Sequence, residues 1–226
     1  MNEYNIIRSA YNNRHFKYYS QFEAQDKFIA NLFKFKTNGH FLDIGSGYSC
    51  SENNSFFFDK FLDWKGICID YRSGEDNYYD RKKTKFYCAD ATTFDYVNAF
   101  KDNNMPNIID YLSIDADSNT NATLKIIPFK DYTFSTITIE HDFYEEGENR
   151  RLEQRQVLTN LGFHLLCGNV CFTRENNQLP WEDWWVNPKS FDLEKLSFLQ
   201  CDGQTADNIN NRFNHEYSDN FLYRML

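Results

Sequence analysis

The sequence predicts an α/β protein with a doubly wound, mostly parallel sheet. Short apolar runs rich in β-branched and aromatic residues alternate with stretches of helical periodicity. This pattern is typical of parallel strands whose two faces are covered by crossover helices. A glycine turn, Gly45-Ser46-Gly47, follows the first run, and two later strand-like runs flank Gly168-Asn169 with no room for a crossover helix between them. We therefore expect the sheet to end in an antiparallel hairpin.

The chain of 226 residues is long enough for one well-buried core and too short for two large domains. We predict a single domain with a leading helical segment over 1–37, a cofactor-binding sheet core over 38–173 and a C-terminal extension over 174–226. The tail after Cys201 is polar and rich in Asn, and we expect it to be loosely held.

Charge and hydropathy exclude several classes of partner. The 24 basic and 33 acidic residues leave a net charge of −9, opposite to the basic surface of proteins that grip nucleic-acid phosphates. No apolar run reaches the length of a signal peptide or of a membrane span, which predicts a soluble, cytoplasmic protein without a membrane partner. The six cysteines are irregularly spaced, so we expect reduced thiols, with Cys167 and Cys171 as core residues. A homo-oligomer is compatible with the sequence.

The individual elements follow from apolar runs bounded by polar or turn residues. Strands are expected at 40–44, 66–70, 85–89, 108–114 and 134–140, with the hairpin over 162–166 and 170–173. Helices are expected at 19–36, 56–64, 76–83, 93–102, 120–127 and 149–161.

Ligands of open α/β sheets lie at the carboxyl ends of the strands, and the informative residues lie there. Asp43 precedes the first turn, where Gly45 and Gly47 let the backbone approach a ligand closely. Asp70 ends the second strand, where a carboxylate can accept hydrogen bonds from a ribose diol. Asp90 follows the third strand and either accepts from an adenine amino group or caps the next helix.

The glycine pattern GSGYS lacks the third glycine of the dinucleotide fingerprint, so a cofactor without a pyrophosphate fits better. S-adenosylmethionine has an adenine, a ribose and an amino-acid end whose ammonium group suits the region of Asp43, whereas NAD requires the missing glycine. The predicted cofactor-binding residues are Asp43, Gly45, Ser46, Gly47, Asp70, Asp90 and Asp115.

Several motifs together resemble one family. SQFEAQDKF (20–28), NGHFLDIGSG (38–47), WKGICID (64–70), DYLSIDAD (110–117) and EHD (140–142) are similar to motifs of FkbM-type class I S-adenosylmethionine-dependent methyltransferases. The resemblance covers about residues 19–173. It implies a Rossmann-like class I methyltransferase fold and O-methylation of a sugar or other small hydroxyl compound. Tyr48-Ser49 stands where the family commonly has a further glycine, and Ala116-Asp117-Ser118 where it commonly has an acid and a glycine.

Five ionisable residues follow the fourth and fifth predicted strands: Asp115, Asp117, Glu140, His141 and Asp142. Asp115, His141 and Asp142 could offer two carboxylates and an imidazole to Mg²⁺ or Mn²⁺. The arrangement is similar to that of metal-dependent small-molecule O-methyltransferases of this fold. Metal binding and a site without metal both stay open.

Methyl transfer requires alignment of the acceptor and removal of its proton. His141, with an unperturbed pKa of about 6.5, is the first candidate base, and Asp115 is the alternative if a metal lowers the pKa of the hydroxyl. A hydrogen-bonded structural histidine is the competing interpretation of His141.

A tryptophan-rich segment, LPWEDWWVNPKSF, spans 179–191. Aromatic faces flanked by acids are common in carbohydrate sites, and they are also common in ordinary cores. We therefore predict that Glu182, Asp183 and Trp184, with Asp117 and Glu140, contact the substrate, and we keep packing over the sheet edge as the alternative.

The sequence thus predicts transfer of the S-adenosylmethionine methyl group to a hydroxyl of a small or glycan-linked substrate. A non-catalytic α/β binding module in glycan assembly is the second interpretation, and an NAD-dependent oxidoreductase is the third.

Overall fold

The computed structural model describes residues 16–72 and 81–223, with side chains up to residue 214. Its centre is one eight-stranded sheet with the strand order β3-β2-β1-β4-β5-β7-β6-β8. The first five strands pair in parallel, β7 is antiparallel to both β5 and β6, and β8 is parallel to β6. The strands are β1 (His40–Ile44), β2 (Lys65–Asp70), β3 (Thr84–Cys88), β4 (Ile108–Ile114), β5 (Thr133–Glu140), β6 (His164–Arg174), β7 (Asn177–Val186) and β8 (Cys201–Asp202).

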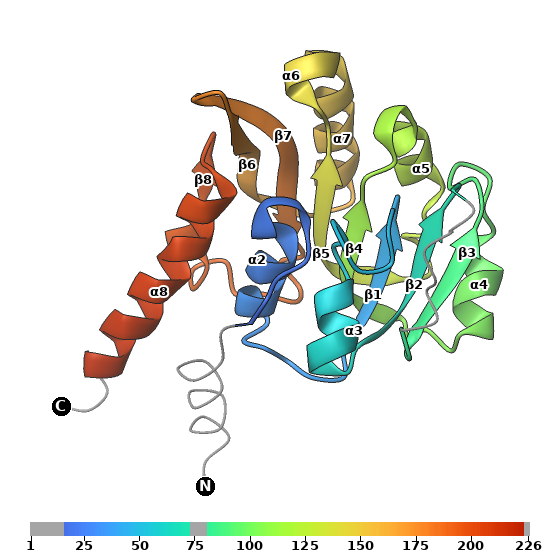
Figure 1. The fold of residues 1–226 in the computed structure, drawn as a ribbon, viewed down its shortest axis with the longest axis horizontal. Helices are drawn as coiled ribbons and strands as arrows, with labels where there is room; N and C mark the ends of the chain where they lie inside the picture. The colour runs from blue at the N-terminus through green and yellow to red at the C-terminus, as the bar shows by residue number, and fades with distance from the viewer. Residues whose placement is uncertain (1–15, 73–80, 224–226) are drawn as a thin grey trace, which may run out of the picture.

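Helices cover both faces of the sheet, as expected for a doubly wound fold (Figure 1). The α-helices are α2 (Gln25–Leu32), α3 (Phe56–Leu62), α4 (Tyr96–Asp102), α5 (Thr120–Ile126), α6 (Phe143–Glu146), α7 (Glu148–Asn160) and α8 (Ala206–Tyr223). Short 3-10 turns are η1 (Gln21–Glu23), η3 (Asp117–Asn119) and η4 (Ser197–Leu199). Side chains of α2, α3 and α8 pack on one face, and those of α4, α5 and α7 pack on the other.

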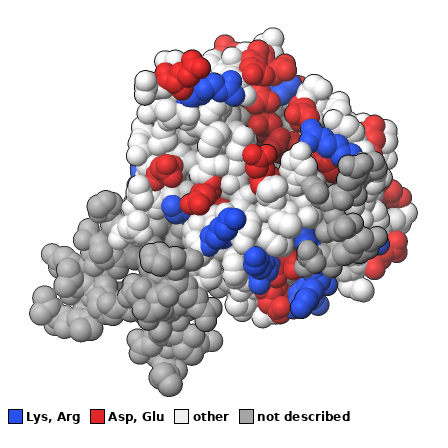
Figure 2. Space-filling model, in the orientation of Figure 1, with Lys and Arg blue, Asp and Glu red and all other residues white. Residues whose placement is uncertain are grey.

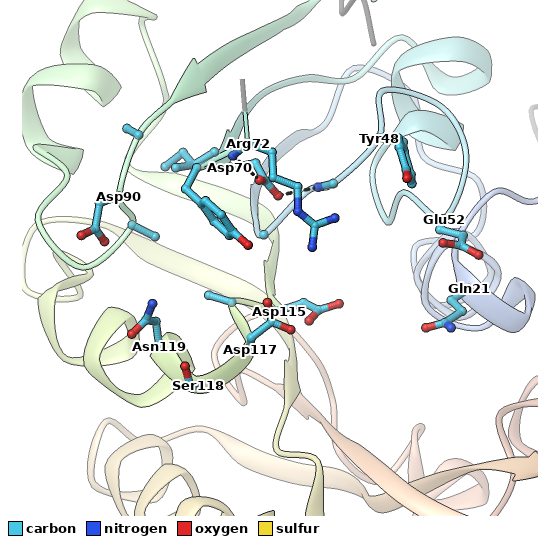
Figure 3. A pocket seen from close by; sticks show the side chains of 17 residues that line it. Gln21, Tyr48, Glu52, Asp70, Arg72, Asp90, Asp115, Asp117, Ser118 and Asn119 are labelled. Carbon is cyan, nitrogen blue, oxygen red and sulfur yellow. Dashed lines mark hydrogen bonds between the residues drawn. The ribbon is translucent and has the colours of Figure 1, made fainter. Parts of the chain in front are cut away.

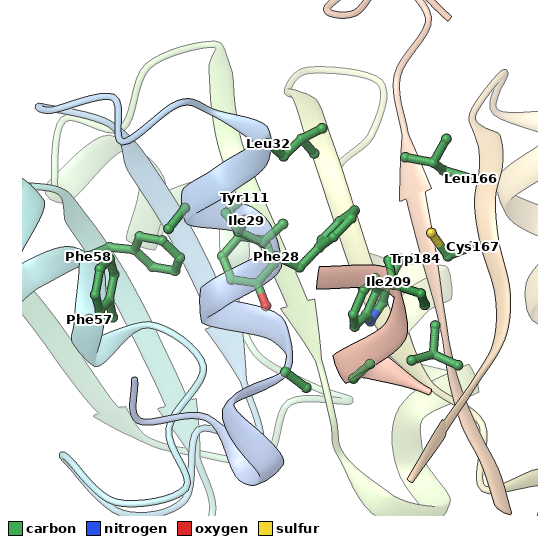
Figure 4. Packing of buried hydrophobic residues seen from close by; sticks show 14 of the residues in the cluster. Phe28, Ile29, Leu32, Phe57, Phe58, Tyr111, Leu166, Cys167, Trp184 and Ile209 are labelled. Atoms are coloured by element: carbon green, nitrogen blue, oxygen red, sulfur yellow. The ribbon is translucent and has the colours of Figure 1, made fainter. Parts of the chain in front are cut away.

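Large aromatic side chains fill the core under α2 (Figure 4). The rings of Phe28 on α2 and Trp184 on β7 lie 4.2 Å apart between centroids, and both side chains are fully buried. Ile209 of α8 joins the same cluster. Because burying one large apolar side chain contributes about 1.5–3 kcal/mol, this cluster fixes α2 and α8 against the later strands.

The predicted hairpin exists, but its position was wrong. Gly168-Asn169 lies inside β6, where Asn169 has a φ of 50° and the pairing with β7 is irregular. The turn is instead Glu175-Asn176, with φ values of 50° and 65°. Two successive left-handed residues match the twist of a two-residue hairpin. The tryptophan-rich segment is therefore the strand β7, inserted between β5 and β6, so the sheet continues beyond residue 173.

Two terminal segments also differ from the predictions. The tail is packed against the core over the part whose side chains are described, because α8 buries Ile209 and Phe213, which are spaced four residues apart on one helical face. The leading helix is not continuous, because Phe22 and Glu23, with φ values of 56° and 51°, interrupt it before α2 begins. The helix expected at 76–83 lies largely outside the described residues.

All six cysteine thiols are free, and Cys167 and Cys171 are buried, as predicted. Along the described chain, no helix combines the length and the apolar character needed to cross a membrane.

Candidate functional site

A cavity of about 510 Å³ opens at the carboxyl ends of β1, β2 and β4. This is the point where the strand order reverses, and pockets of about 300–1,000 Å³ are typical of small-molecule sites. In Figure 3, Asp70 and Arg72 face Asp115 and Asp117 across the cavity. Figure 3 also shows Asp90 at one end and Gln21, Tyr48 and Glu52 at the other. The remaining lining residues are Gly45, Gly47, Ile69, Tyr71, Ala89, Ala91, Ala116, Ser118 and Asn119.

The glycine turn after β1 needs both glycines, for different reasons. Gly45 has a φ of +73°, and a Cβ there would lie 1.5 Å from the carbonyl oxygen of Asp115. Only glycine therefore permits β1 and β4 to continue side by side into the cavity wall. Gly47 has a φ of +56°, and a Cβ there would meet no atom within 4 Å. The backbone of Gly47 thus borders open space beside the cavity.

Asn53 holds this turn in place from behind. Its side-chain amide donates to the carbonyl oxygens of Ser46 at 2.8 Å and Tyr48 at 2.9 Å. Its Oδ1 accepts from the backbone N–H of Phe56 at 2.7 Å and from the Arg81 guanidinium at 3.0 Å. Since Phe56 begins α3, one buried side chain ties the helix start to the glycine turn.

Asp43 belongs to the same network and does not line the cavity. The Ser55 hydroxyl donates to Asp43 Oδ2 at 2.6 Å. Burial raises the pKa of Asp43 to about 6, although the Ser55 hydrogen bond and the Arg81 charge oppose the rise. Ser46 is also buried outside the cavity lining. We therefore assign both residues to the support of the turn, rather than to the direct cofactor contact that the sequence predicted.

Asp70 lies at the end of β2, and each oxygen of its carboxylate accepts a hydrogen bond from the backbone. Oδ2 accepts from the backbone N–H of Gly47, and Oδ1 accepts from the backbone N–H of Arg72, both at 2.8 Å. A carboxylate has about four acceptor positions, so the side chain retains capacity for two further donors. The geometry suits a diol presented from the cavity.

Asp90 lines the far end of the cavity, and its side chain stabilises the turn that it begins. Its Oδ1 accepts from the backbone N–H of Thr92 at 2.8 Å and from the Thr92 hydroxyl at 2.7 Å. The Thr92 side chain, with its backbone N–H, lowers the pKa of Asp90. Asp90 is not the cap of the following helix, because Asp95 caps α4. The exposed ring of Tyr71 and the methyl groups of Ala89 and Ala91 line the cavity with it.

Carboxyl groups gather where β4 and β5 end. Asp115 lines the cavity and shares a hydrogen bond with the side chain of Glu140. Burial raises the pKa of both groups, and hydrogen bonding to Asp115 and the negative charges around it help to raise that of Glu140 to about 12. Glu140 therefore keeps its proton at neutral pH and donates it to Asp115. Glu182 lies directly opposite Glu140 in the β5–β7 register.

Among the described residues, the structure does not bring the predicted metal ligands together, and the candidate base His141 does not line the cavity. His141 is fully buried; its Nδ1 accepts from the backbone N–H of Phe143 at 3.1 Å, and its Nε2 lies 3.5 Å from Asp183 Oδ1. Asp142 pairs with Arg150 at 3.2 Å. The part of the chain that the structure describes contains no group of three His, Cys, Asp or Glu side chains able to hold a metal ion.

The predicted substrate wall is mostly structural. Arg155 of α7 donates to both oxygens of Asp183, at 2.7 and 2.8 Å, and the backbone N–H of Asn169 also donates to Asp183 at 2.8 Å. Trp184 is fully buried against Phe28. In place of the substrate contacts that the sequence predicted, Asp183 forms a buried ion pair and Trp184 is a core residue. Asp117 is exposed and lines the cavity, and Glu182 lies beside Glu140, so their substrate roles stay predictions.

Sequence reasoning missed the residues that close the cavity from outside the sheet. Gln21 comes from η1, and Glu52 from the loop before α3. No strand end or spacing rule marks either residue. Tyr71 and Arg72 directly follow Asp70, so their position after a strand could have indicated them.

Comparison with models of known protein families gave no match, and comparison with curated protein sequences gave none.

Solved structures do match the fold. A protein from Streptococcus thermophilus described as a "putative hemolysin" is 10% identical, with 92% of this chain and 79% of that chain covered and a TM-score of 0.52. Aeropyrum pernix fibrillarin with bound S-adenosyl-L-methionine is 12% identical over 71% of this chain and 74% of that chain, with a TM-score of 0.47. Precorrin-6y C5,15-methyltransferase from Geobacter metallireducens is 10% identical over 72% and 87%, with a TM-score of 0.48. The match to the Streptococcus thermophilus protein, with the strand order, shows a Rossmann-like doubly wound α/β fold, and at this identity it shows the fold alone.

Proposed function

We propose that this protein is an S-adenosylmethionine-dependent methyltransferase. One observation carries the proposal: a glycine turn, a fixed carboxylate at the end of β2 and an acidic turn after β3 all line one cavity at the switch point of the sheet. Each of these features matches one part of a nucleoside cofactor without a pyrophosphate. The methyltransferases among the structural matches have the same fold and add no more than that.

The residues present fit this cofactor. Asp70 would accept from the ribose hydroxyls with its remaining lone pairs, and Asp90 would accept from the adenine amino group. Tyr71 and Ala91 offer apolar surface for the base. The open space beside the Gly47 backbone leaves room for the amino-acid end. The acidic lining also suits a molecule that carries a sulfonium and an ammonium group.

When bound, the cofactor supplies an electrophilic methyl group. The chain then has to align the acceptor and take its proton; alignment contributes about 7–11 kcal/mol and a base a further factor of roughly 10²–10⁴. We assign the base to Asp115, which lines the cavity, because His141 is fully buried and does not line it. Glu140, as a hydrogen-bond donor, positions the Asp115 carboxylate.

We further propose that the acceptor atom is a hydroxyl oxygen of a sugar or another small glycan-linked compound. The net charge of −9 and the acids Glu52 and Asp117 at the cavity argue against a phosphate-rich acceptor. Hydroxyl groups are good donors to carboxylates, so the same acids suit a polyhydroxyl compound. The motifs that resemble the FkbM-type family point to the same class of acceptor.

The non-catalytic binding module stays the second candidate. Of the two bases that the sequence proposed, His141 and Asp115, only Asp115 lines the cavity among the described residues. Isothermal titration with S-adenosylhomocysteine and with NAD tests the cofactor class. Binding of S-adenosylhomocysteine alone supports the proposal, and preference for NAD contradicts it. Release of radiolabelled methyl to a glycan acceptor then separates the enzyme from the binding module.

A further inference from the structure

Two cysteine side chains lie next to each other at the edge of the sheet. In the parallel pairing of β6 with β8, Cys167 lies opposite Cys201. Neighbouring strands are about 4.8 Å apart, and a disulfide joins residues whose Cα atoms are about 4.4–6.8 Å apart. Residues that pair across two strands direct their side chains to the same face of the sheet. The strand register therefore places the two thiols within reach of a disulfide bond.

The two thiols differ in exposure and acidity. Cys167 is fully buried in the aromatic cluster shown in Figure 4, whereas Cys201 is half-buried. The neighbouring Cys167 thiol is the main cause that lowers the pKa of Cys201, and the positive charge of Arg212 lowers it further. Burial is the main cause that raises the pKa of Cys167. Because the thiolate is the reactive form, Cys201 is the thiol that reacts first with an oxidant.

Few backbone contacts attach β8 to the sheet. It is a strand of 2 residues at the end of the strand order, and its second pair is Gly168 with Asp202. The backbone N–H of Gly203, just beyond it, donates to the carbonyl oxygen of Gly168 at 2.9 Å. The chain then continues into α8, where Asn210 Nδ2 donates to the carbonyl oxygen of Ala24 at 3.2 Å, directly before α2. A covalent bond in β8 would therefore also hold α8 in its place against α2.

The charge of the chain favours neutral oxidants. The net charge is −9, and Figure 2 shows acidic side chains gathered in a run that descends from the region of α6 toward the carboxyl ends of β4 and β5. A large anionic oxidant such as glutathione disulfide is repelled by this charge. Hydrogen peroxide is small and neutral, so neither the charge nor the half-buried position of Cys201 excludes it.

We propose that Cys167 and Cys201 are a modification site, at which hydrogen peroxide converts the two thiols into a disulfide bond. The bond fastens the C-terminal layer, which we define as β8 and α8, to the rest of the sheet. This site lies outside the cavity and does not depend on the proposed methyl transfer. The chain is thus stabilised in an oxidising environment and returns to its reduced state when a dithiol is present.

The oxidation takes place in two steps. The Cys201 thiolate attacks one oxygen of the peroxide, so that an S–O bond forms, the O–O bond breaks and the released hydroxide takes up the thiol proton as water. The Cys167 sulfur then attacks the sulfenic sulfur of Cys201. The S–S bond forms, the S–O bond breaks, and the departing hydroxide leaves with the Cys167 proton as a second water. Two thiols are oxidised while one peroxide is reduced.

The test exposes the full chain to a few molar equivalents of hydrogen peroxide at neutral pH. We expect peptide mapping by mass spectrometry to show a peptide with Cys167 linked to one with Cys201, lighter by two hydrogen atoms than the sum of the two. The oxidised protein should unfold at a Tm about 5 °C or more above that of the reduced protein, because the bond closes a long loop and restricts the unfolded chain. Dithiothreitol should reverse both changes.

Cys201→Ser and Cys167→Ser should each abolish the bond and the rise in Tm. Cys171→Ser, four residues further along β6, and Cys88→Ser, at the exposed end of β3, should retain both. The two test variants complement each other, because Cys167→Ser places a hydroxyl in the core whereas Cys201 is half-buried, and circular dichroism checks their folding. A bond between other cysteines, two thiols that stay unlinked, or an unchanged Tm in the linked protein would overturn the proposal.

Discussion

Replacing Glu182 by Gln should raise the free energy of unfolding at neutral pH. Burial is the main cause that raises the pKa of this carboxyl from 4.5 to about 8, and the nearby Trp184 side chain and the hydrogen bond from Gln25 oppose the rise. At neutral pH the folded chain therefore retains a proton that the unfolded chain releases. The stability that belongs to protonated Glu182 is fully present below pH 4.5 and is lost as the pH rises toward 8.

The magnitude follows from the pKa difference. One pKa unit corresponds to about 1.4 kcal/mol, so between about pH 4.5 and pH 7 the wild-type chain should lose about 3 kcal/mol through this group. Glu182→Gln is nearly isosteric and does not titrate. The variant should therefore lose about 3 kcal/mol less than the wild type over the same range.

Urea unfolding at a series of pH values measures this difference. Asp26 and Asp43, whose pKa values are raised to about 6 mainly by burial, titrate in the same range but contribute equally to both chains. Asp131→Asn, which removes an exposed acid just before β5, is the control for removal of an acid. An equal loss of stability in wild type and Glu182→Gln between pH 5 and 7 would refute the reasoning.

Three further predictions concern the turn, the core and the buried ion pair. Gly45→Ala should abolish S-adenosylhomocysteine binding or folding, because its Cβ would lie 1.5 Å from the Asp115 oxygen, whereas Gly47→Ala should be milder in calorimetry and thermal unfolding. Trp184→Ala should cost about 3–5 kcal/mol in urea unfolding and leave the cofactor affinity of the folded protein unchanged. Burial favours protonated Asp183, but hydrogen bonds from Arg155 and the His141 ring 3.5 Å away overcome it and lower its pKa to about 2. The contribution of ionised Asp183 to the free energy of unfolding is fully present above pH 3.8 and is lost as the pH falls toward 2. Asp183→Asn should therefore remove this step from acid unfolding and cost about 3 kcal/mol near neutral pH.

Local sequence patterns were sufficient for the parallel half of the sheet. The runs at 40–44 and 108–114 became β1 and β4 with the predicted bounds, because buried parallel strands are continuous apolar runs between turn residues. The hairpin could not be placed the same way. Glu175-Asn176 forms the turn although Gly168-Asn169 is the stronger turn signal, since pairing of β7 with β5 decides the register.

Residues of the candidate site could be predicted from the sequence where their position at the end of a strand is enough to place them at the cavity. Asp70, Asp90 and Asp115 line the cavity for this reason. His141 was misplaced because the sequence does not show that the residue directly after β5 is buried beside Asp183, a residue 42 positions later in the chain. Gln21 was missed because its place at the cavity depends on the left-handed backbone at Phe22 and Glu23, which interrupts the leading helix and which no sequence pattern marks.

Titration of S-adenosylhomocysteine into the wild type, Asp70→Asn and the control Asp131→Asn tests the central claim most directly. Asp70 fixes the Gly47 backbone and keeps acceptor capacity for a ribose diol, so the exchange should cost about 1–3 kcal/mol of affinity, roughly 5- to 150-fold. We predict binding by the wild type and the control and weakened binding by Asp70→Asn. Failure of the wild type to bind, or an unchanged affinity in Asp70→Asn, would contradict the assignment of this cavity to the cofactor.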